Sequence, residues 1–234
     1  MKIVRTAVYF LLRPIIRLKE MLPKNARLIS EVRLHDYVEI GGIFFDKPKE
    51  LLESLGKDRK NPLLEPGAFY PLYYDSNPKT LDLLELVIEK NRPAIVVETG
   101  VANGASTRRI LEAFKRFDLV NSRLYSFDID SRVAAQELIE NPQFTFILVD
   151  SPERFTSSLR KIGSVDLFYH DSDHSYKNQM LEYSEAWKVL STEKGVLISD
   201  DVDWSNAFLD FCKEIGRTPL LLSDMSTFSG IICK

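Results

Sequence analysis

Hydrophobic and polar positions follow one regular pattern from about residue 77 to the C-terminus. Short apolar runs, typical of buried strands, are separated by segments whose apolar residues recur at helical spacing. The runs predict strands over 94–98, 124–127, 144–149, 165–169 and 195–199. The segments around them predict helices over 77–91, 106–114, 131–139, 152–162, 176–190 and 206–215.

The last two apolar runs, 218–222 and 229–233, predict a different kind of connection. The segment between them is too short for a crossover helix, so these two strands must be antiparallel. Strands that alternate with helices and end in such a hairpin predict an α/β layered domain over 77–234 with a mostly parallel sheet.

Residues 1–76 do not share this pattern and predict an N-terminal extension of helix and loop. Its segment 3–18 is apolar but contains Arg5, Arg13 and Arg17, so it is too short and too charged for a membrane-spanning helix. A signal peptide is disfavoured because no small-residue cleavage site follows. Such a basic amphipathic segment either lies on a membrane surface, contacts another subunit of a homo-oligomer, or packs on its own domain.

Two further segments of the extension are distinctive. Residues 48–56 predict a short helix that ends at Gly56. The aromatic-rich segment 67–74 predicts a loop that either packs the extension onto the domain or lines an acceptor site.

Composition narrows the classes of partner. The formal net charge is −3 and Lys and Arg are scattered, so the sequence gives no sign of a nucleic-acid-binding surface. Two cysteines give no disulfide framework and favour a reducing compartment such as the cytoplasm.

Ionisable residues follow two of the predicted strands. The run 165–169 ends in His170-Asp171-Ser172-Asp173-His174, and the run 195–199 ends in Asp200-Asp201. In open α/β folds, ligands bind at the carboxyl ends of parallel strands, and carboxylate oxygens suit Mg²⁺. These residues therefore predict a divalent metal and a catalytic base. The alternatives are helix capping for Asp171 to Asp173 and a plain loop start for Asp200-Asp201.

A glycine-containing turn follows the first strand, with Glu98 before it, Gly100 and Gly104 within it, and Ser106 at its end. Glycines allow a tight turn and a close approach to a ligand, and the following helix supplies free N–H groups. The turn has Ala102 where a dinucleotide fingerprint would have glycine. A carboxylate such as Glu98 beside the ligand suits an ammonium group better than a pyrophosphate.

The next two strands also end in carboxylates. Asp128 closes the second strand, where it can accept the hydroxyls of a ribose. Asp130 is its rival for this role, or else caps the following helix. Asp150 closes the third strand, where it or Ser151 can face an adenine.

Glu98-Thr99-Gly100-x-x-x-Gly104-x-Ser106, with Asp128 and Asp150 in step, resembles the class I S-adenosylmethionine-dependent methyltransferases. The resemblance covers roughly 77–234 and implies a Rossmann-like, doubly wound, seven-stranded sheet. It implies that Glu98 and Gly100 border the methionine part of the cofactor and that Asp128 holds the ribose. Asp150 and Ser151 would lie by the adenine.

A second resemblance is narrower. Asp171-x-x-His174, followed by Asp200-Asp201, is similar to the metal-dependent sugar O-methyltransferases of macrolide and aminocoumarin tailoring. It implies that Asp171, Asp200 and Asp201 bind Mg²⁺ and that His174 is the base, with Asp173 as the alternative base.

The sequence thus predicts methylation of a hydroxyl on a sugar or glycan. The alternatives are a phenolic or catechol-like acceptor, or a binding protein that has lost turnover. Trp204, just after the acidic pair, either stacks on a sugar face or belongs to the core.

Overall fold

The computed structural model describes Ser76, residues 78–133, 136–223 and 228–234, and the backbone of three short strands nearer the N-terminus. The predicted features at 3–18, 48–56 and 67–74 lie outside the described residues. Within the described part of the chain, no helix is long and apolar enough to cross a membrane.

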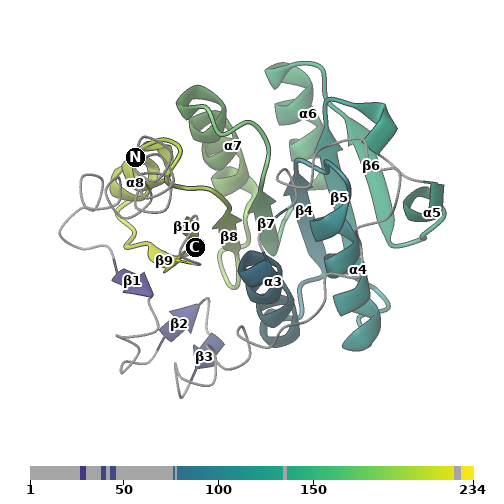
Figure 1. Cartoon of the computed structure of the whole chain (residues 1–234), viewed down its shortest axis with the longest axis horizontal. Coiled ribbons are helices and arrows are strands. Elements are labelled where there is room, and N and C mark those ends of the chain that lie inside the picture. Colours follow the sequence, from purple (N-terminus) through teal and green to yellow (C-terminus); the bar gives the residue numbers. More distant parts are fainter. Residues whose placement is uncertain are drawn as a thin grey trace, which may run out of the picture.

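The central feature is one sheet of eight strands in the order β1-β9-β10-β8-β7-β4-β5-β6 (Figure 1). Its strands are β1 (Arg27–Ile29), β4 (Ile95–Thr99), β5 (Arg123–Asp128), β6 (Phe144–Leu148), β7 (Leu167–His170), β8 (Val196–Ser199), β9 (Leu220–Ser223) and β10 (Phe228–Cys233). Only β10 runs antiparallel to its neighbours in this sheet. The seven predicted strands and their antiparallel end are confirmed, and β1 adds an eighth strand beside β9. A separate hairpin is formed by β2 (Val38–Ile40) and β3 (Ile43–Phe45).

The helices also follow the prediction closely. They are α3 (Pro78–Asn91), α4 (Ala105–Arg116), α5 (Gln136–Ile139), α6 (Pro152–Ile162), α7 (Tyr176–Val189) and α8 (Ala207–Glu214). One prediction was wrong in detail: the single helix expected over 131–139 is a 3₁₀ turn, η2 (Ser131–Val133), followed by the short α5. Asp130 caps η2, because its carboxylate accepts the backbone N–H of Arg132 at 2.9 Å.

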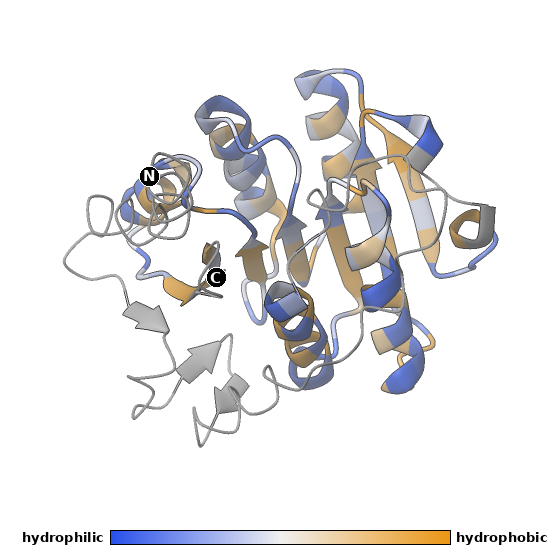
Figure 2. Ribbon diagram, viewed as in Figure 1, coloured by the Kyte–Doolittle hydropathy of each residue, from blue (hydrophilic) through white to orange (hydrophobic). Residues whose placement is uncertain are grey.

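Two hydrophobic cores lie on opposite faces of the sheet. Residues of α3 and α4, such as Leu84 and Ile110, pack on one face, and residues of α6, α7 and α8, such as Phe155 and Phe208, pack on the other. Figure 2 shows the result: hydrophobic residues predominate in the central strands, whereas the helices carry both hydrophobic and hydrophilic residues. Strands buried on both faces require the continuous apolar runs that made them visible in the sequence.

A buried ion pair fixes α3 against α4. The guanidinium of Arg109, 5% exposed, lies 2.9 Å from Asp82 and 3.1 Å from Glu85. This contact holds the start of α3, which contributes side chains to the site described below.

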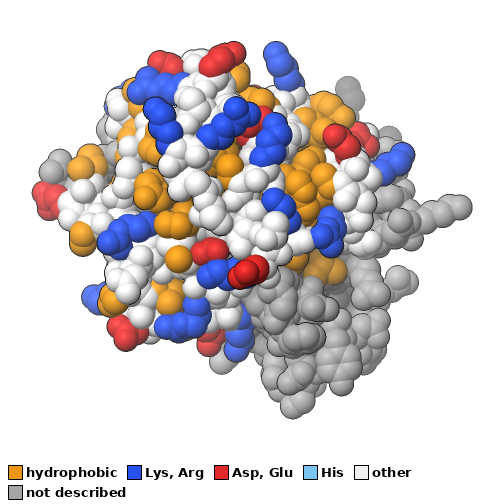
Figure 3. All heavy atoms as spheres, turned by 180° about the vertical axis from the view of Figure 1, so that it is seen from behind, with side chains coloured by type: hydrophobic (Ala, Val, Ile, Leu, Met, Phe, Trp, Pro, Cys, Tyr) orange, Lys and Arg blue, Asp and Glu red, His pale blue; other side chains and the backbone are white. Residues whose placement is uncertain are grey.

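The surface carries charges of both signs. Figure 3 shows Lys and Arg side chains dispersed over one face among hydrophobic and neutral groups, with a few Asp and Glu side chains between them.

The strand order places all the predicted site segments at one edge. The connections after β4 and β7 lead to opposite sides of the sheet, and such a switch point leaves a crevice at the carboxyl ends of the strands. The segments that follow β4, β5, β6, β7 and β8 therefore meet there.

Candidate active site

A cavity of about 460 Å³ lies at the carboxyl ends of β4, β5, β6 and β7. This volume is within the range of small-molecule sites. Its apolar lining consists of Phe127, Ile129, Val149, Pro152, Phe155 and Leu181, and its carboxylates are Asp128, Asp150, Asp171, Asp173 and Glu182. The cavity can therefore take a ligand with a flat apolar part and several hydrogen-bond donors or positive charges.

The glycine turn after β4 forms one wall of this cavity. Gly100 has φ +84°, and a Cβ atom there would lie 2.1 Å from the carbonyl oxygen of Asp171. Any side chain at this position would collide with the backbone after β7. Glycine is therefore required both by this close contact and by the positive φ. Gly104, with φ +80°, begins α4 and lies outside the cavity lining, as does Ser106.

Glu98 is fully buried beneath the turn rather than exposed to the cavity. Its carboxylate accepts hydrogen bonds from the hydroxyls of Ser106, Thr107 (2.6 Å) and Ser126 (2.6 Å). Glu98 thus joins the first turn of α4 to β4 and β5. Burial raises its pKa to about 7, although the three hydroxyls act in the opposite direction.

Asp128 lies at the end of β5 and lines the cavity. One carboxylate oxygen accepts the backbone N–H groups of Val101 (2.8 Å) and Ala102 (3.4 Å), and the other accepts that of Asp130 (2.9 Å). The carboxylate is therefore fixed against the glycine turn, at the place predicted for a ribose-binding group.

Asp150 and Ser151 border the same cavity after β6. Asp150 is exposed and lies 3.0 Å from Arg154. The Ser151 hydroxyl caps α6 by accepting the backbone N–H of Arg154 at 3.3 Å. Ile129, 81% exposed, also lines the cavity and was missed by the sequence analysis. The one feature of the sequence that could have indicated Ile129 is its apolar side chain within a polar segment, directly after Asp128.

His174 lies between two of the predicted metal-binding carboxylates. Its Nε2 atom is 3.5 Å from Asp171 Oδ1, and its Nδ1 atom is 3.5 Å from Asp201 Oδ2. Burial alone would lower the pKa of His174, but the adjacent carboxylates of Asp171 and Asp201 raise it to about 10. In this arrangement the imidazole is protonated at neutral pH.

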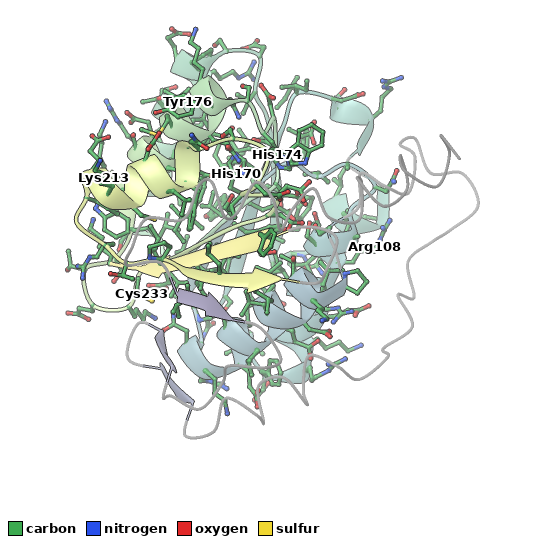
Figure 4. The ribbon with its side chains drawn as sticks, turned by 60° about the vertical axis from the view of Figure 1, so that its left-hand side comes forward. Arg108, His170, His174, Tyr176, Lys213 and Cys233 are labelled. Atoms are coloured by element: carbon green, nitrogen blue, oxygen red, sulfur yellow. The ribbon has the colours of Figure 1, made fainter. Side chains whose placement is uncertain are left out.

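His170 stands beside His174, and their ring centroids are 5.5 Å apart (Figure 4). It is fully buried, and burial lowers its pKa well below the usual value, so this ring is neutral.

Hydroxyl groups hold the carboxylates of Asp171 and Asp200. Asp171 Oδ2 accepts hydrogen bonds from Ser76 (2.5 Å) and Tyr169 (3.1 Å). Asp200 Oδ1 accepts hydrogen bonds from Thr80 (3.1 Å) and Ser229 (2.9 Å). None of these partners was predicted; Ser76, Thr80 and Ser229 come from distant segments and have no local signature.

Asp173 forms hydrogen bonds within its own loop. Its two carboxylate oxygens accept the backbone N–H of Ser175 at 3.0 Å and the Ser175 hydroxyl at 2.8 Å. Asp173 thereby fixes the segment that leads into α7. This agrees with the alternative prediction that it caps the helix.

The carboxylates of Asp171, Asp200 and Asp201 are of the ligand type that a hard divalent cation prefers, but they are not arranged around a common point. Among the residues that the structure describes, no three His, Cys, Asp or Glu side chains are placed to hold a metal ion. His174 separates Asp171 from Asp201, and Asp200 uses one oxygen for Thr80 and Ser229. Three carboxylates at two neighbouring strand ends are nevertheless the ligands that Mg²⁺ prefers. Burial, followed by repulsion from Asp171 and Asp201, raises the pKa of Asp200.

Comparison with known proteins agrees with this fold. Residues 97–202 match a family model described as a methyltransferase domain. No curated protein sequence matches the chain.

Solved structures of methyltransferases have a similar fold. An O-methyltransferase from Bacillus cereus in complex with SAH has a TM-score of 0.56 and 18% identity, over 70% of this chain and 84% of that one. The SAH-bound methyltransferase PaMTH1 of Podospora anserina has a TM-score of 0.54 and 12% identity, over 85% and 90%. The O-methyltransferase TomG from Streptomyces achromogenes, involved in tomaymycin synthesis and in complex with SAM, has a TM-score of 0.54 and 15% identity, over 68% and 79%. At these identities the similarity establishes the shared fold.

The raised pKa of Glu98 predicts a pH-dependent stability. The pKa is 4.5 in the unfolded chain and about 7 in the folded one, so between these values the folded state binds more protons. Raising the pH from 4.5 to 7 should therefore lower the free energy of unfolding, by up to about 3 kcal/mol from this group. Glu98→Gln should remove this part of the pH dependence, measured by urea unfolding at pH 5 and pH 8. The exposed Glu112→Gln is the control, and a Glu98→Gln curve parallel to that of the wild type would contradict the assignment.

Proposed function

We propose that this protein is an S-adenosylmethionine-dependent O-methyltransferase that acts on a hydroxyl of a sugar or glycan with the help of a divalent metal. The observation that carries the proposal is one cavity, in the region that matches a methyltransferase-domain model, whose lining includes a fixed Asp128 and also Asp171. Asp171 in turn contacts His174, which contacts Asp201. Asp128 suits a cofactor ribose, and the cluster of Asp171, His174 and Asp201 suits an acceptor hydroxyl.

The cavity supports one orientation of the cofactor. The apolar side chains Ile129, Val149 and Phe155 fit an adenine, with Asp150 and Ser151 at its rim. Asp128 then meets the ribose hydroxyls, and the methionine end extends towards Gly100 and Asp171. Two of the similar solved structures hold SAH and a third holds SAM, which favours the same class of ligand here.

This orientation directs the sulfonium methyl group towards Asp171 in the cavity lining, next to which His174 lies. In the transfer, a lone pair of the acceptor oxygen forms the new bond to the methyl carbon while the carbon–sulfur bond breaks. The products are the methyl ether and S-adenosylhomocysteine, and the acceptor hydroxyl loses its proton. His174 is the proposed recipient of that proton.

The base role of His174 imposes a constraint. A protonated imidazole cannot accept a proton, and in the described arrangement Asp171 and Asp201 keep the ring protonated. For His174 to act as the base, Asp171 and Asp201 must therefore bind another group during catalysis, so that the imidazole can lose its proton. In the proposal Asp171, Asp200 and Asp201 hold Mg²⁺, which when bound lowers the pKa of a coordinated hydroxyl and fixes its oxygen.

Trp204 supports a sugar acceptor. Its side chain is 54% exposed, so it does not belong to the core. Its indole N–H donates a hydrogen bond to Asp201 Oδ2 at 3.0 Å, which holds the ring beside the acidic pair. In the proposal the indole ring lies next to the reacting hydroxyl. Its apolar face can pack on the apolar face of a pyranose, while its polar N–H stays bonded to Asp201.

Cofactor binding provides the first test. Isothermal titration calorimetry should detect S-adenosylmethionine binding to the wild type, and Asp128→Asn should weaken it about 100-fold because charged hydrogen bonds to the ribose are lost. Asp130→Asn, which removes the rival carboxylate, should bind nearly as well as the wild type. If the wild type does not bind the cofactor, the methyltransferase assignment fails.

Metal dependence provides the second test. Transfer of a labelled methyl group to a panel of free and nucleotide-linked sugars should stop in excess chelator and return when Mg²⁺ is added. A phenolic panel run in parallel distinguishes the acceptor classes. Full activity in chelator would exclude the metal role of Asp171, Asp200 and Asp201 and leave the cofactor assignment intact.

A further inference from the structure

Glu182 is a buried carboxylate that the proposed reaction does not use. It lies on α7, is 7% exposed, and lines the cavity together with Thr99, Ser172 and Asn178. A buried carboxylate is costly unless several donors hold it, so its partners indicate why it is there.

One of those partners, Ser172, belongs to the loop that carries the proposed catalytic groups; the others are Asn178 on α7 and His170 at the end of β7, 3.6 Å away. The Ser172 hydroxyl lies 2.9 and 3.0 Å from the two oxygens of Glu182. Asn178, one turn earlier on the same helix, contacts Glu182 at 3.1 Å and reaches back to the Asp173 carbonyl at 3.0 Å. Two side chains of α7, Glu182 and Asn178, thus form hydrogen bonds with the loop between Asp171 and His174.

The opposite side of the loop is fixed by the sheet. The backbone N–H of Asp171 donates to the Thr99 carbonyl at 2.8 Å, and the Gly100 turn packs directly on the Asp171 carbonyl. The loop is held between β4 and α7, and Ser172 is the side chain that joins it to α7. A change in the Glu182–Ser172 contact would move Asp171 and His174 relative to the cofactor cavity.

We infer that Glu182, with Asn178, is a positioning residue that sets the loop 171–174 through Ser172 and so aligns the acid–base cluster with the methyl donor. The inference rests on the proposed function for its catalytic consequence. Its structural part, the placement of His174, stands independently of any activity.

The test uses Glu182→Gln and Ser172→Ala in the full chain, with Glu185→Gln as the matched control. Glu185 lies one turn further along α7 and pairs with Arg160 and Lys188 instead of the loop. The ring protons of the three histidines are recorded by NMR, and His174→Gln assigns the resonance of His174. Glu182→Gln and Ser172→Ala should each shift or broaden the His174 resonance, and Glu185→Gln should leave it unchanged.

Kinetics give the second readout. Both loop variants should lower turnover about 10- to 100-fold, the effect of a misplaced reacting group, with a smaller change in the acceptor KM. Ser172→Thr, which keeps the hydroxyl, should recover most of the turnover. The double variant should be no slower than the slower single variant, because both changes break the same contact.

The outcomes separate the two proposals. An unchanged His174 resonance in Glu182→Gln, or fully additive effects in the double variant, would overturn the positioning role. If the wild type shows no methyl transfer, the proposed function fails while the NMR comparison still decides the positioning role. If Glu182→Gln does not fold, Asn178→Ala replaces it in the same comparison.

Discussion

The site depends on the close approach of two backbone segments, the turn at Gly100 and the chain at Asp171. A Cβ atom at position 100 would lie 2.1 Å from the Asp171 carbonyl oxygen, so the approach is available only to glycine. It brings the turn after β4 against the loop after β7, and these strands are neighbours in the sheet. The wall of the cavity and the acid–base cluster are therefore parts of one packed unit.

Hydroxyl groups hold the buried carboxylates of this unit, and Asp171 also lies beside His174. Glu98 is held by three hydroxyls, Asp171 by Ser76 and Tyr169, and Asp200 by Thr80 and Ser229. Hydroxyl donors fix the direction of a carboxylate but leave its charge uncompensated. The pKa of each of these three carboxyl groups is raised, chiefly by burial. The cavity beside them is lined by the carboxylates of Asp128, Asp150, Asp171, Asp173 and Glu182. Acidic groups that line a concave site attract positive ligands, which suits a cofactor with a sulfonium and an ammonium group, and a divalent cation.

Much of this arrangement was visible in the sequence. The apolar runs gave the strands because a sheet covered on both faces needs continuous apolar strands. The carboxylates that end those runs had to gather at one edge because parallel strands share their direction. The sequence therefore predicted that Asp128, Asp150 and Asp171 would lie together.

The remainder depended on information that a linear pattern does not carry. A strand buried on both faces does not show from its sequence which face each residue takes. Glu98 was expected beside the ligand, and the structure buries it against α4, outside the cavity lining. The partners of Asp171 and Asp200 lie 95 and 120 residues away in the chain, at Ser76 and Thr80. Glu182 resembled any other polar residue of an amphipathic helix until its contact with Ser172 was seen.

The most direct test of the account is a crystal structure of the full chain with S-adenosylhomocysteine. The account predicts that the ribose hydroxyls contact Asp128, that the adenine lies against Ile129 and Phe155, and that the sulfur atom faces Asp171 and His174. A ligand bound elsewhere, or bound in this cavity with its sulfur directed away from His174, would contradict it.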